Sequence, residues 1–311
     1  MSTTAPTSVV PRRRPAPAPS QKPASAPRRR EPLWVSKPFI YLILLSYLLV
    51  VIYPMFWLLY TSLKPDREIF LHPFSLPDVH HLQWQNFSGA WVKARFGNYF
   101  FNSALITLST VVVTTFLSAM AAYAVSRFRF FGARPIFFYF LAGLMVPLQL
   151  TIVPLFFEMK SFDLLGTRTG LFLAYLAFGF PFAIFILTGF FRSLPASLHE
   201  SALLDGCTEW GAFRHVMLPM ARPGLITVAI FLFLGNWNEF FVAFICMSGK
   251  NSEHARTLPL GLANITIVSQ YRSDWGLAFA GLVMTMLPVL VVYLFLQKHL
   301  TKGITAGAVK G

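Results

Sequence analysis

Six long stretches of the chain contain almost no charged side chain, and each is at least 23 residues long. About 20 consecutive apolar residues in a helix cross the roughly 30 Å hydrocarbon core of a bilayer. Because lipid offers no hydrogen-bonding partner, a spanning segment of open chain must satisfy its backbone internally, as a helix. The pattern therefore predicts an all-α polytopic membrane protein with six transmembrane helices. The expected spans are approximately 38–62, 102–126, 135–158, 169–192, 222–247 and 276–297.

Between the fourth and fifth spans lies a partly polar segment, residues 194–221, that is far longer than an ordinary connection. Ser197, followed three residues later by a glutamate, has the pattern of a capping box, which predicts a helix start. Gly206 suits the end of that helix, where φ is positive. Thr208 is placed to cap a second short helix, which Pro219 is expected to end. The segment is therefore predicted to form a helix-turn-helix outside the bilayer.

The fifth apolar stretch contains a polar cluster that includes Asn236, Asn238 and Glu239. If one helix continues to near Met247, Asn236 and Glu239 are three residues apart and share a face. A carboxylate near the bilayer centre costs at least a few kcal/mol on insertion scales, so Glu239 is expected to face the bundle interior or a wet cavity. Two interpretations stay open: a path for a hydroxylated substrate, or a structural role as a hydrogen bond between helices or an ion pair with an arginine of a partner subunit.

Prolines lie deep in several expected spans, and Gly179-Phe180-Pro181 is the clearest weak point. Each proline frees a carbonyl and bends its helix unless a neighbouring group compensates. Kinked helices suit a protein that opens and closes a pathway, but kinks occur in membrane proteins of every function.

Residues 1–36 are rich in proline, alanine and arginine, which predicts a disordered basic cytoplasmic tail lying on anionic lipid. Residues 37–311 are the expected membrane domain. With the N-terminus inside, the inner segments hold 17 of the 26 lysines and arginines, eight of them in the tail up to Lys37. This bias favours an orientation with both ends inside (N-in/C-in) and places the 194–221 segment in the cytoplasm.

Composition narrows the class of function. Hydrophobic residues make up 55% of the chain and charged residues 12%, whereas soluble domains carry about 25% charged residues. The net charge is +14, but the basic residues are not interleaved with aromatic residues as they are in nucleic-acid modules. No nucleic-acid partner is therefore expected. Cys207 and Cys246 give neither a disulfide framework nor metal-ligand spacing. The sequence shows no phosphate-binding loop and no catalytic constellation, so the chain is not expected to be an enzyme.

A spaced motif lies in the 194–221 segment: a Glu-Ser-Ala triplet from Glu200, then Gly206, Val216 and a Leu-Pro pair. It resembles the EAA loop of ABC importer permeases, written E-A-A-x3-G-x9-I-x-L-P. The resemblance implies that this loop is a coupling helix seated in a cleft of a cytoplasmic ATPase. The alternative is a plain helical hairpin whose Glu200 only caps its own helix. The implied ATPase-coupling residues are Glu200, Ser201, Ala202, Asp205, Gly206, Val216, Leu218 and Pro219.

Further motifs are Ser62–Pro65, Tyr99–Ser103, Gln149 between two prolines, Trp237-Asn238 and the glycine-rich terminus. With them, residues 33–311 resemble the carbohydrate-type, maltose-permease-like subunits of binding-protein-dependent ABC importers in the bacterial inner membrane. The resemblance implies the type I importer permease fold, a second permease, two ATPase subunits that bind ATP and magnesium, and an external solute-binding protein. It implies no cofactor or metal bound by this chain. The expected substrate-path residues are Gln149, Asn236, Asn238 and Glu239.

Two other classes of function stay open at this point. A secondary carrier or channel would work without an ATPase and would show buried charges or an inverted repeat, and no convincing repeat is visible. A membrane scaffold would act by recruiting partners of the basic tail. Deleting residues 2–30 separates these classes, because a transporter should keep its activity whereas a scaffold should lose its function.

Overall fold

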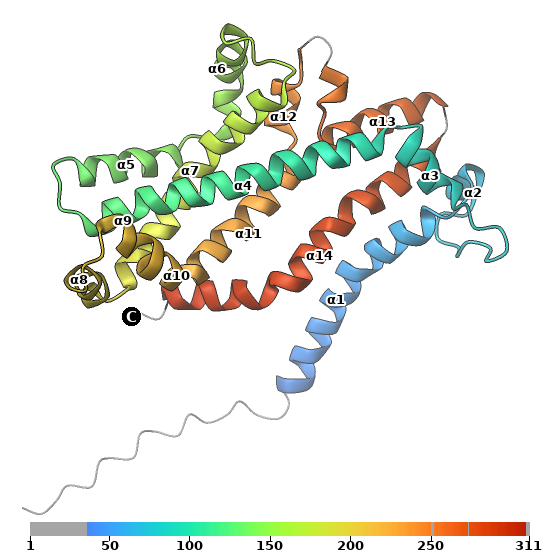
Figure 1. Cartoon of the computed structure of the whole chain (residues 1–311). Helices are drawn as coiled ribbons and strands as arrows, with labels where there is room; N and C mark the ends of the chain where they lie inside the picture. The colour runs from blue at the N-terminus through green and yellow to red at the C-terminus, as the bar shows by residue number, and fades with distance from the viewer. Residues whose placement is uncertain (1–35, 250–251, 273, 309–311) are drawn as a thin grey trace, which may run out of the picture. The chain divides into compact units, whose positions relative to one another are not determined.

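The computed structural model describes residues 36–249, 252–272 and 274–308. Every regular element in these ranges is a helix, which confirms the all-α prediction (Figure 1). The expected basic tail lies outside the described residues except for Ser36. The longer helices are α1 (Ser36–Thr61), α4 (Phe96–Arg127), α5 (Ala133–Gly143), α6 (Leu148–Ser161), α7 (Arg168–Ser193), α8 (Ala196–Leu204), α11 (Arg222–Asn238), α13 (Leu258–Arg272) and α14 (Trp275–Ala308). The shorter ones are α2 (Asp66–Leu71), α3 (Gln85–Val92), α9 (Glu209–Ala212), the π-helix η1 (Phe213–Met217), α10 (Leu218–Met220), α12 (Phe241–Cys246) and the 3₁₀ helix η2 (Ser252–His254).

The chain divides into two units, Met1–Ile52 and Tyr53–Gly311. The described part of the first unit is the beginning of α1, whose large apolar side chains from Phe39 to Val51 are exposed. A helix that is apolar on all sides is stable in a protein core or in lipid. Since these side chains are not buried by the protein, this part of α1 suits lipid or another membrane subunit.

The core of the second unit forms where α4, α7 and α11 pack together and α14 packs along α11 (Figure 1). Gly179 in α7 permits this close approach, because a Cβ there would lie 3.1 Å from side-chain carbons of both Thr114 and Leu232. The helix α7 continues unbroken through Pro181. The weak point expected at Gly179 and Pro181 is therefore a place of tight packing and does not interrupt the helix.

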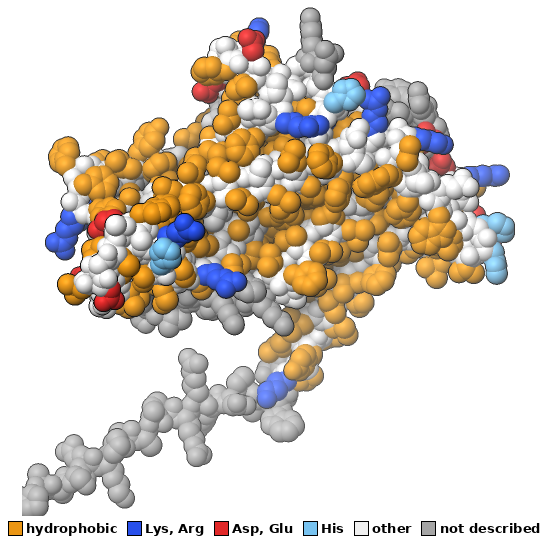
Figure 2. All heavy atoms as spheres, viewed as in Figure 1, with side chains coloured by type: hydrophobic (Ala, Val, Ile, Leu, Met, Phe, Trp, Pro, Cys, Tyr) orange, Lys and Arg blue, Asp and Glu red, His pale blue; other side chains and the backbone are white. Residues whose placement is uncertain are grey.

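Four helices in the described residues are long and apolar enough to cross a membrane: α1, α4, α7 and α14. Two bent pairs pass the same test if each is counted as one span, which gives up to six candidates. The pair α5 and α6 bends by 99°, and Pro147 precedes α6 in an extended conformation. A proline disfavours helical geometry in the residue before it, which explains the break. Hydrophobic side chains cover much of the face shown in Figure 2.

The segment between α1 and α4 is folded and not a loose loop. Lys64 is fully buried, and its ammonium donates to the His72 carbonyl at 2.9 Å. Burial lowers the pKa of the Lys64 ammonium, because removal from water disfavours the charged form. The Asn86 amide donates to the carbonyls of Ser62 and Lys64 at 2.9 and 3.1 Å. These bonds fix α3 against the chain that leaves α1.

Two polar side chains of α4 hold a distant part of the chain. Asn102 is buried, and its amide donates to the carbonyls of His254 and Arg256 at 2.7 and 2.9 Å. The neighbouring Ser103 hydroxyl accepts from the Leu258 N–H at 2.7 Å. The segment before α13 is thus attached to the beginning of α4 by three hydrogen bonds across about 150 residues of sequence.

Candidate functional site

The helix α8 carries the first part of the motif in the 194–221 segment. It begins at Ala196, directly after Pro195, and no side chain caps its start. The expected capping box is therefore wrong, since Ser197 lies inside the helix. Pro195 explains the shift: its carbonyl accepts the Leu198 N–H at 3.3 Å, so the first turn closes earlier than the sequence pattern predicts. Proline has no amide hydrogen that would need a cap.

The end of α8 agrees with the prediction from the sequence. Gly206 has a φ of +85°, in the left-handed region that favours glycine. Its N–H donates to the Leu203 carbonyl at 3.0 Å, and the Cys207 N–H donates to the Ala202 carbonyl at 3.0 Å. This pair of bonds is a Schellman motif, which satisfies two of the last free carbonyls of a helix. Gly206 therefore sets the angle at which the chain leaves α8.

The second helix of the segment starts as expected and runs further than expected. Thr208 caps it, since the Thr208 hydroxyl accepts the Gly211 N–H at 3.1 Å. The helix then widens into the π turn η1, where the Leu218 N–H donates to the Phe213 carbonyl. Pro219 lies in the first turn of α10, where no amide hydrogen is needed. The helix consequently continues to Met220, before a bend of 73° into α11.

The expected coupling residues divide between two environments. One group is exposed and is available to a partner: Glu200, Ser201, Asp205, Gly206 and Pro219. The other group is buried or half-buried against the bundle: Ala202, Val216 and Leu218. Val216 and Leu218 pack against the main hydrophobic cluster of the second unit. The segment thus combines an exposed polar face with apolar anchors in the membrane bundle.

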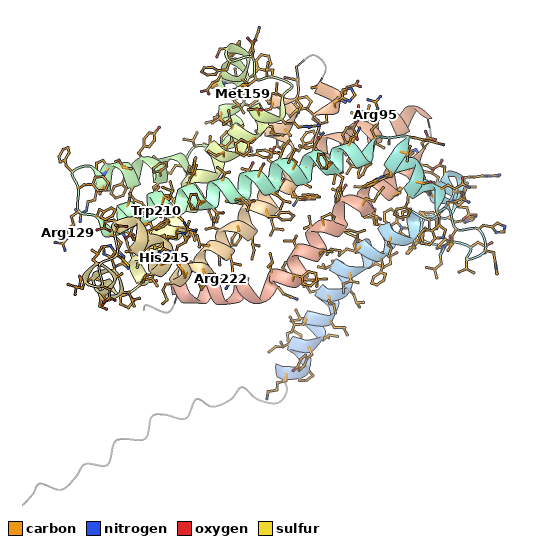
Figure 3. All side chains as sticks on the ribbon, in the orientation of Figure 1. Arg95, Arg129, Met159, Trp210, His215 and Arg222 are labelled. Carbon is orange, nitrogen blue, oxygen red and sulfur yellow. The ribbon has the colours of Figure 1, made fainter. Side chains whose placement is uncertain are left out.

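A cavity of about 1030 Å³ adjoins α8 and is lined mainly by residues 125–135, which are the connection between α4 and α5 and the adjoining ends of both helices. Arg127 is held in place there, because its guanidinium donates to the carbonyls of Phe191 and Leu194 at 2.7 and 2.8 Å. Figure 3 shows Arg129, Trp210 and His215 at this end of the second unit, far from Arg95. The surface beside α8 is therefore basic. The arginines that line the cavity are Arg127, Arg129, Arg134 and Arg192.

The polar cluster after α11 differs from the expected geometry. The helix α11 ends at Asn238, and Glu239 has an extended conformation with a ψ of 130°. The expectation of one helix running to Met247 is therefore wrong. The Glu239 carboxylate accepts the N–H groups of Val242 and Ala243 at 2.8 and 3.0 Å, and the Tyr175 hydroxyl donates to it at 3.1 Å. The charge is thus satisfied by the start of α12 and by a neighbouring helix.

The four expected path residues do not form one hydrogen-bonded group in the described part of the chain. Gln149 is exposed in the first turn of α6. The Asn238 amide donates to the Leu234 carbonyl of its own helix at 2.8 Å. Asn236 is half-buried, and its side-chain nitrogen has no hydrogen-bond partner. A buried amide without a hydrogen-bond partner costs free energy. Asn236 is therefore the expected path residue with an unsatisfied donor.

Sequence reasoning missed a polar contact behind α8. His199 Nε2 lies 2.9 Å from a carboxylate oxygen of Glu209. The Tyr123 hydroxyl of α4 donates to the same oxygen at 3.4 Å. Glu209 lies among the nine unspecified positions of the EAA pattern, so the motif gives no signal for it. The ten-residue separation of His199 and Glu209 is bridged only by the turn at Gly206.

These features together define the membrane subunit of a transporter: an α-helical bundle of candidate spans with an EAA-type loop on its surface. Residues 114–306 match the family model described as "Binding-protein-dependent transport system inner membrane component". The match covers more than half of the chain, and the chain belongs to this family of ABC importer permeases. The resemblance drawn from the motifs is thereby confirmed, and so is the location in the membrane.

Several relatives agree with this assignment. The chain is 44% identical over 265 residues to the diacetylchitobiose uptake system permease protein NgcG of Streptomyces coelicolor, covering 85% of this chain and 86% of that protein. It is 36% identical over 258 residues to the trehalose transport system permease protein SugB of Mycobacterium tuberculosis, covering 83% and 92%. A chain of a bacterial ABC transporter involved in the import of the acidic polysaccharide alginate has the same fold, with a TM-score of 0.71, 22% identity, and coverage of 85% and 96%.

Proposed function

We propose that this chain is one of two permease subunits of an ATP-driven importer for a sugar or oligosaccharide. The observation that carries the proposal is the exposed face of α8 with Glu200 and Ser201, in a segment whose Val216 and Leu218 pack against the main hydrophobic cluster. A short helix that ends sharply at Gly206 and carries an exposed Glu200 is suited to dock in a cleft of a soluble partner. The relatives named for sugar uptake support a sugar as the cargo, and none of them supports a stand-alone carrier.

The partners in this proposal follow from the division of labour in the family. Two ATPase subunits bind ATP and magnesium and dock on α8 from the cytoplasm, a sister permease completes the path, and a solute-binding protein delivers the cargo outside. The distribution of lysine and arginine supports this arrangement, because it favours an N-in/C-in orientation with the 194–221 segment on the cytoplasmic side. The tail, residues 1–36, lies on anionic lipid of the inner leaflet in this proposal.

The proposed path uses neutral amide side chains. Gln149, Asn236 and Asn238 each offer a donor and an acceptor, which suits the hydroxyl groups of a sugar. Asn236 supports this role best, since its side-chain nitrogen lacks a partner within the described residues. Glu239 is assigned a structural role instead, because its carboxylate already caps α12 and bonds to Tyr175.

Site-specific cross-linking tests the docking part of the proposal. The introduced thiol belongs at Ser201, which is exposed, and not at the buried Ala202. Cys207 is first replaced by serine, and the Ser201→Cys chain is co-expressed with ATPase subunits that carry single cysteines. Leu76→Cys is the control, because Leu76 is exposed and belongs to the opposite side of the membrane in the proposed orientation.

The expected result is a cross-link from Ser201→Cys to the ATPase that changes when nucleotide binds, with none from Leu76→Cys. A folded, membrane-inserted chain that gives no ATPase cross-link from Ser201→Cys would refute the docking role. The cargo class is tested by uptake of radiolabelled diacetylchitobiose and trehalose in cells with and without this chain. The panel is then widened to other oligosaccharides. If the uptake of every sugar tested is the same with and without this chain, the sugar assignment is contradicted.

A further inference from the structure

The helix α8 has a narrow inner face. Of its nine residues, only Leu198, His199 and Ala202 are not exposed. The motif residues Glu200 and Ser201 point to solvent. A helix repeats every 3.6 residues, so positions 198, 199 and 202 fall on one side. Whatever force reaches the outer face of α8 must therefore pass to the bundle through these three side chains and the two ends of the helix.

His199 makes the polar part of this connection. Its Nε2 atom lies 2.9 Å from Glu209, and the His199 side chain is only 13% exposed. No other side chain of α8 makes a hydrogen bond to a separate element in the described part of the protein. Leu198 and Ala202 contribute apolar contacts, and the alanine is small. A hydrogen bond to a charged group is directional and strong, so it resists displacement of the helix better than these contacts do.

The connection continues from Glu209 into the membrane bundle. The Tyr123 hydroxyl of α4 donates to the Glu209 oxygen that faces His199. The Tyr123 and His199 rings also meet edge to face, with centroids 5.8 Å apart. Tyr123 itself is buried and packs on Phe191 of α7 and Phe213 of η1, at centroid distances of 5.8 and 5.1 Å. One tyrosine thus joins α8 and α9 to the two helices at the centre of the bundle.

We propose that His199, Glu209 and Tyr123 form a latch that transmits movement of α8 to α4. The latch rests on the proposed docking of an ATPase on the outer face of α8. His199 and Glu209 are positioning residues in this arrangement: they do not touch the ATPase or the cargo, and they fix the orientation of α8 on the bundle. Ordinary packing would keep α8 attached without the latch, but it would let α8 shift without moving α4.

The test separates docking from transmission and needs no knowledge of the cargo. The chain is reconstituted in nanodiscs with its sister permease and ATPase subunits, with Cys207 and Cys246 replaced. A single cysteine at Asn98, an exposed position in the first turn of α4 and outside the expected span 102–126, reports movement through its rate of maleimide labelling with and without ATP. Docking is measured separately through the Ser201→Cys cross-link. The variants are His199→Ala, His199→Gln and Tyr123→Phe.

We expect His199→Ala to keep the cross-link while the effect of ATP on labelling falls roughly tenfold, the ratio that corresponds to loss of one hydrogen bond to a charged group. His199→Gln should restore most of the effect, because its amide can donate to Glu209. Tyr123→Phe removes only the hydroxyl and should give an intermediate loss. Thermal melting of the reconstituted complex should differ little between His199→Gln and the parent chain.

An unchanged ATP response in His199→Ala would overturn the latch and leave the docking proposal standing. So would a His199→Gln variant that melts like the parent chain and responds as poorly as His199→Ala, because the hydrogen bond would then not be the cause. If the Ser201→Cys cross-link does not form even with His199 and Tyr123 unchanged, the docking proposal itself is refuted, and the latch with it.

Discussion

Asn102 provides a quantitative test of how the membrane bundle holds the segment before α13. Substitution of Asn102 by alanine removes two donors, 2.7 and 2.9 Å from the carbonyls of His254 and Arg256. Asn102 is only 1% exposed, so water does not readily replace the lost amide. At about 1–1.5 kcal/mol for each bond, the attachment should weaken by about 2–3 kcal/mol.

Amide hydrogen exchange measures this change locally. The Ala255 N–H is hydrogen-bonded within the attached segment, to the Ser252 carbonyl, and the Gly261 N–H in the first turn of α13 is bonded to the Thr257 carbonyl. Local opening controls their exchange. A loss of about 2–3 kcal/mol should accelerate exchange by about 30- to 150-fold. Amides in the middle of α7 should keep their protection, because the two hydrogen bonds of Asn102 go to the carbonyls of His254 and Arg256 and not to α7.

Asn98→Ala is the matched control. Asn98 lies one turn earlier in the same helix, is exposed, and has no side-chain hydrogen bond in the described structure. Its substitution should change the exchange of Ala255 and Gly261 less than about threefold, as for a surface site worth under 0.5 kcal/mol. Equal exchange in Asn98→Ala and Asn102→Ala would show that the two hydrogen bonds do not hold the segment.

Three further substitutions have expected outcomes. Gly206→Asp should leave the protein in the membrane but uncouple ATP hydrolysis from transport, because a side chain at a φ of +85° costs about 1–2 kcal/mol and alters the exit from α8; normal coupling in proteoliposomes would contradict this. Glu239→Ala should lower transport and the melting temperature, because it removes the α12 cap, which is worth about 1 kcal/mol. Glu239→Gln should retain most of both, and equal effects of the two substitutions would show that the cap is unimportant. Gly261→Val should reduce the amount of folded protein in the membrane, since a Cβ there would overlap the Tyr99 ring. An accumulation equal to that of the parent chain would refute the packing.

The sequence predicted those features that depend on neighbouring residues. Gly206 and Thr208 were assigned correctly because a positive φ and a hydroxyl cap are set by a few consecutive positions. Ser197 was assigned wrongly because Pro195, two residues earlier, already closes the first turn. The apolar pattern also identified the membrane character of the chain, since hydrocarbon thickness sets a length that is visible in the sequence.

Features that join distant residues were not predictable in the same way. The break at Glu239 is hidden because the stretches 225–234 and 240–247 are both apolar, so hydropathy averages over the short polar cluster between them and does not register a change of ψ. The attachment of Asn102 to the His254 carbonyl involves a backbone group, which every residue possesses and no pattern marks. The contact between His199 and Glu209 likewise depends on the fold of the turn between them.

The π turn at Phe213–Met217 turns the length of the EAA-type motif into an angular constraint. Each residue of a helix advances the chain by about 100° around the axis. The wide turn holds one residue more than an ordinary turn, so it offsets the rotation of about 100° that this residue would add to everything after it. Leu218 thereby keeps its place against the bundle, and an ordinary turn with the same number of residues would bring α11 into the membrane in a different rotational phase. The length of the nine-residue spacer therefore sets the rotation of α11 relative to α8, and this length matters more than the composition of the spacer.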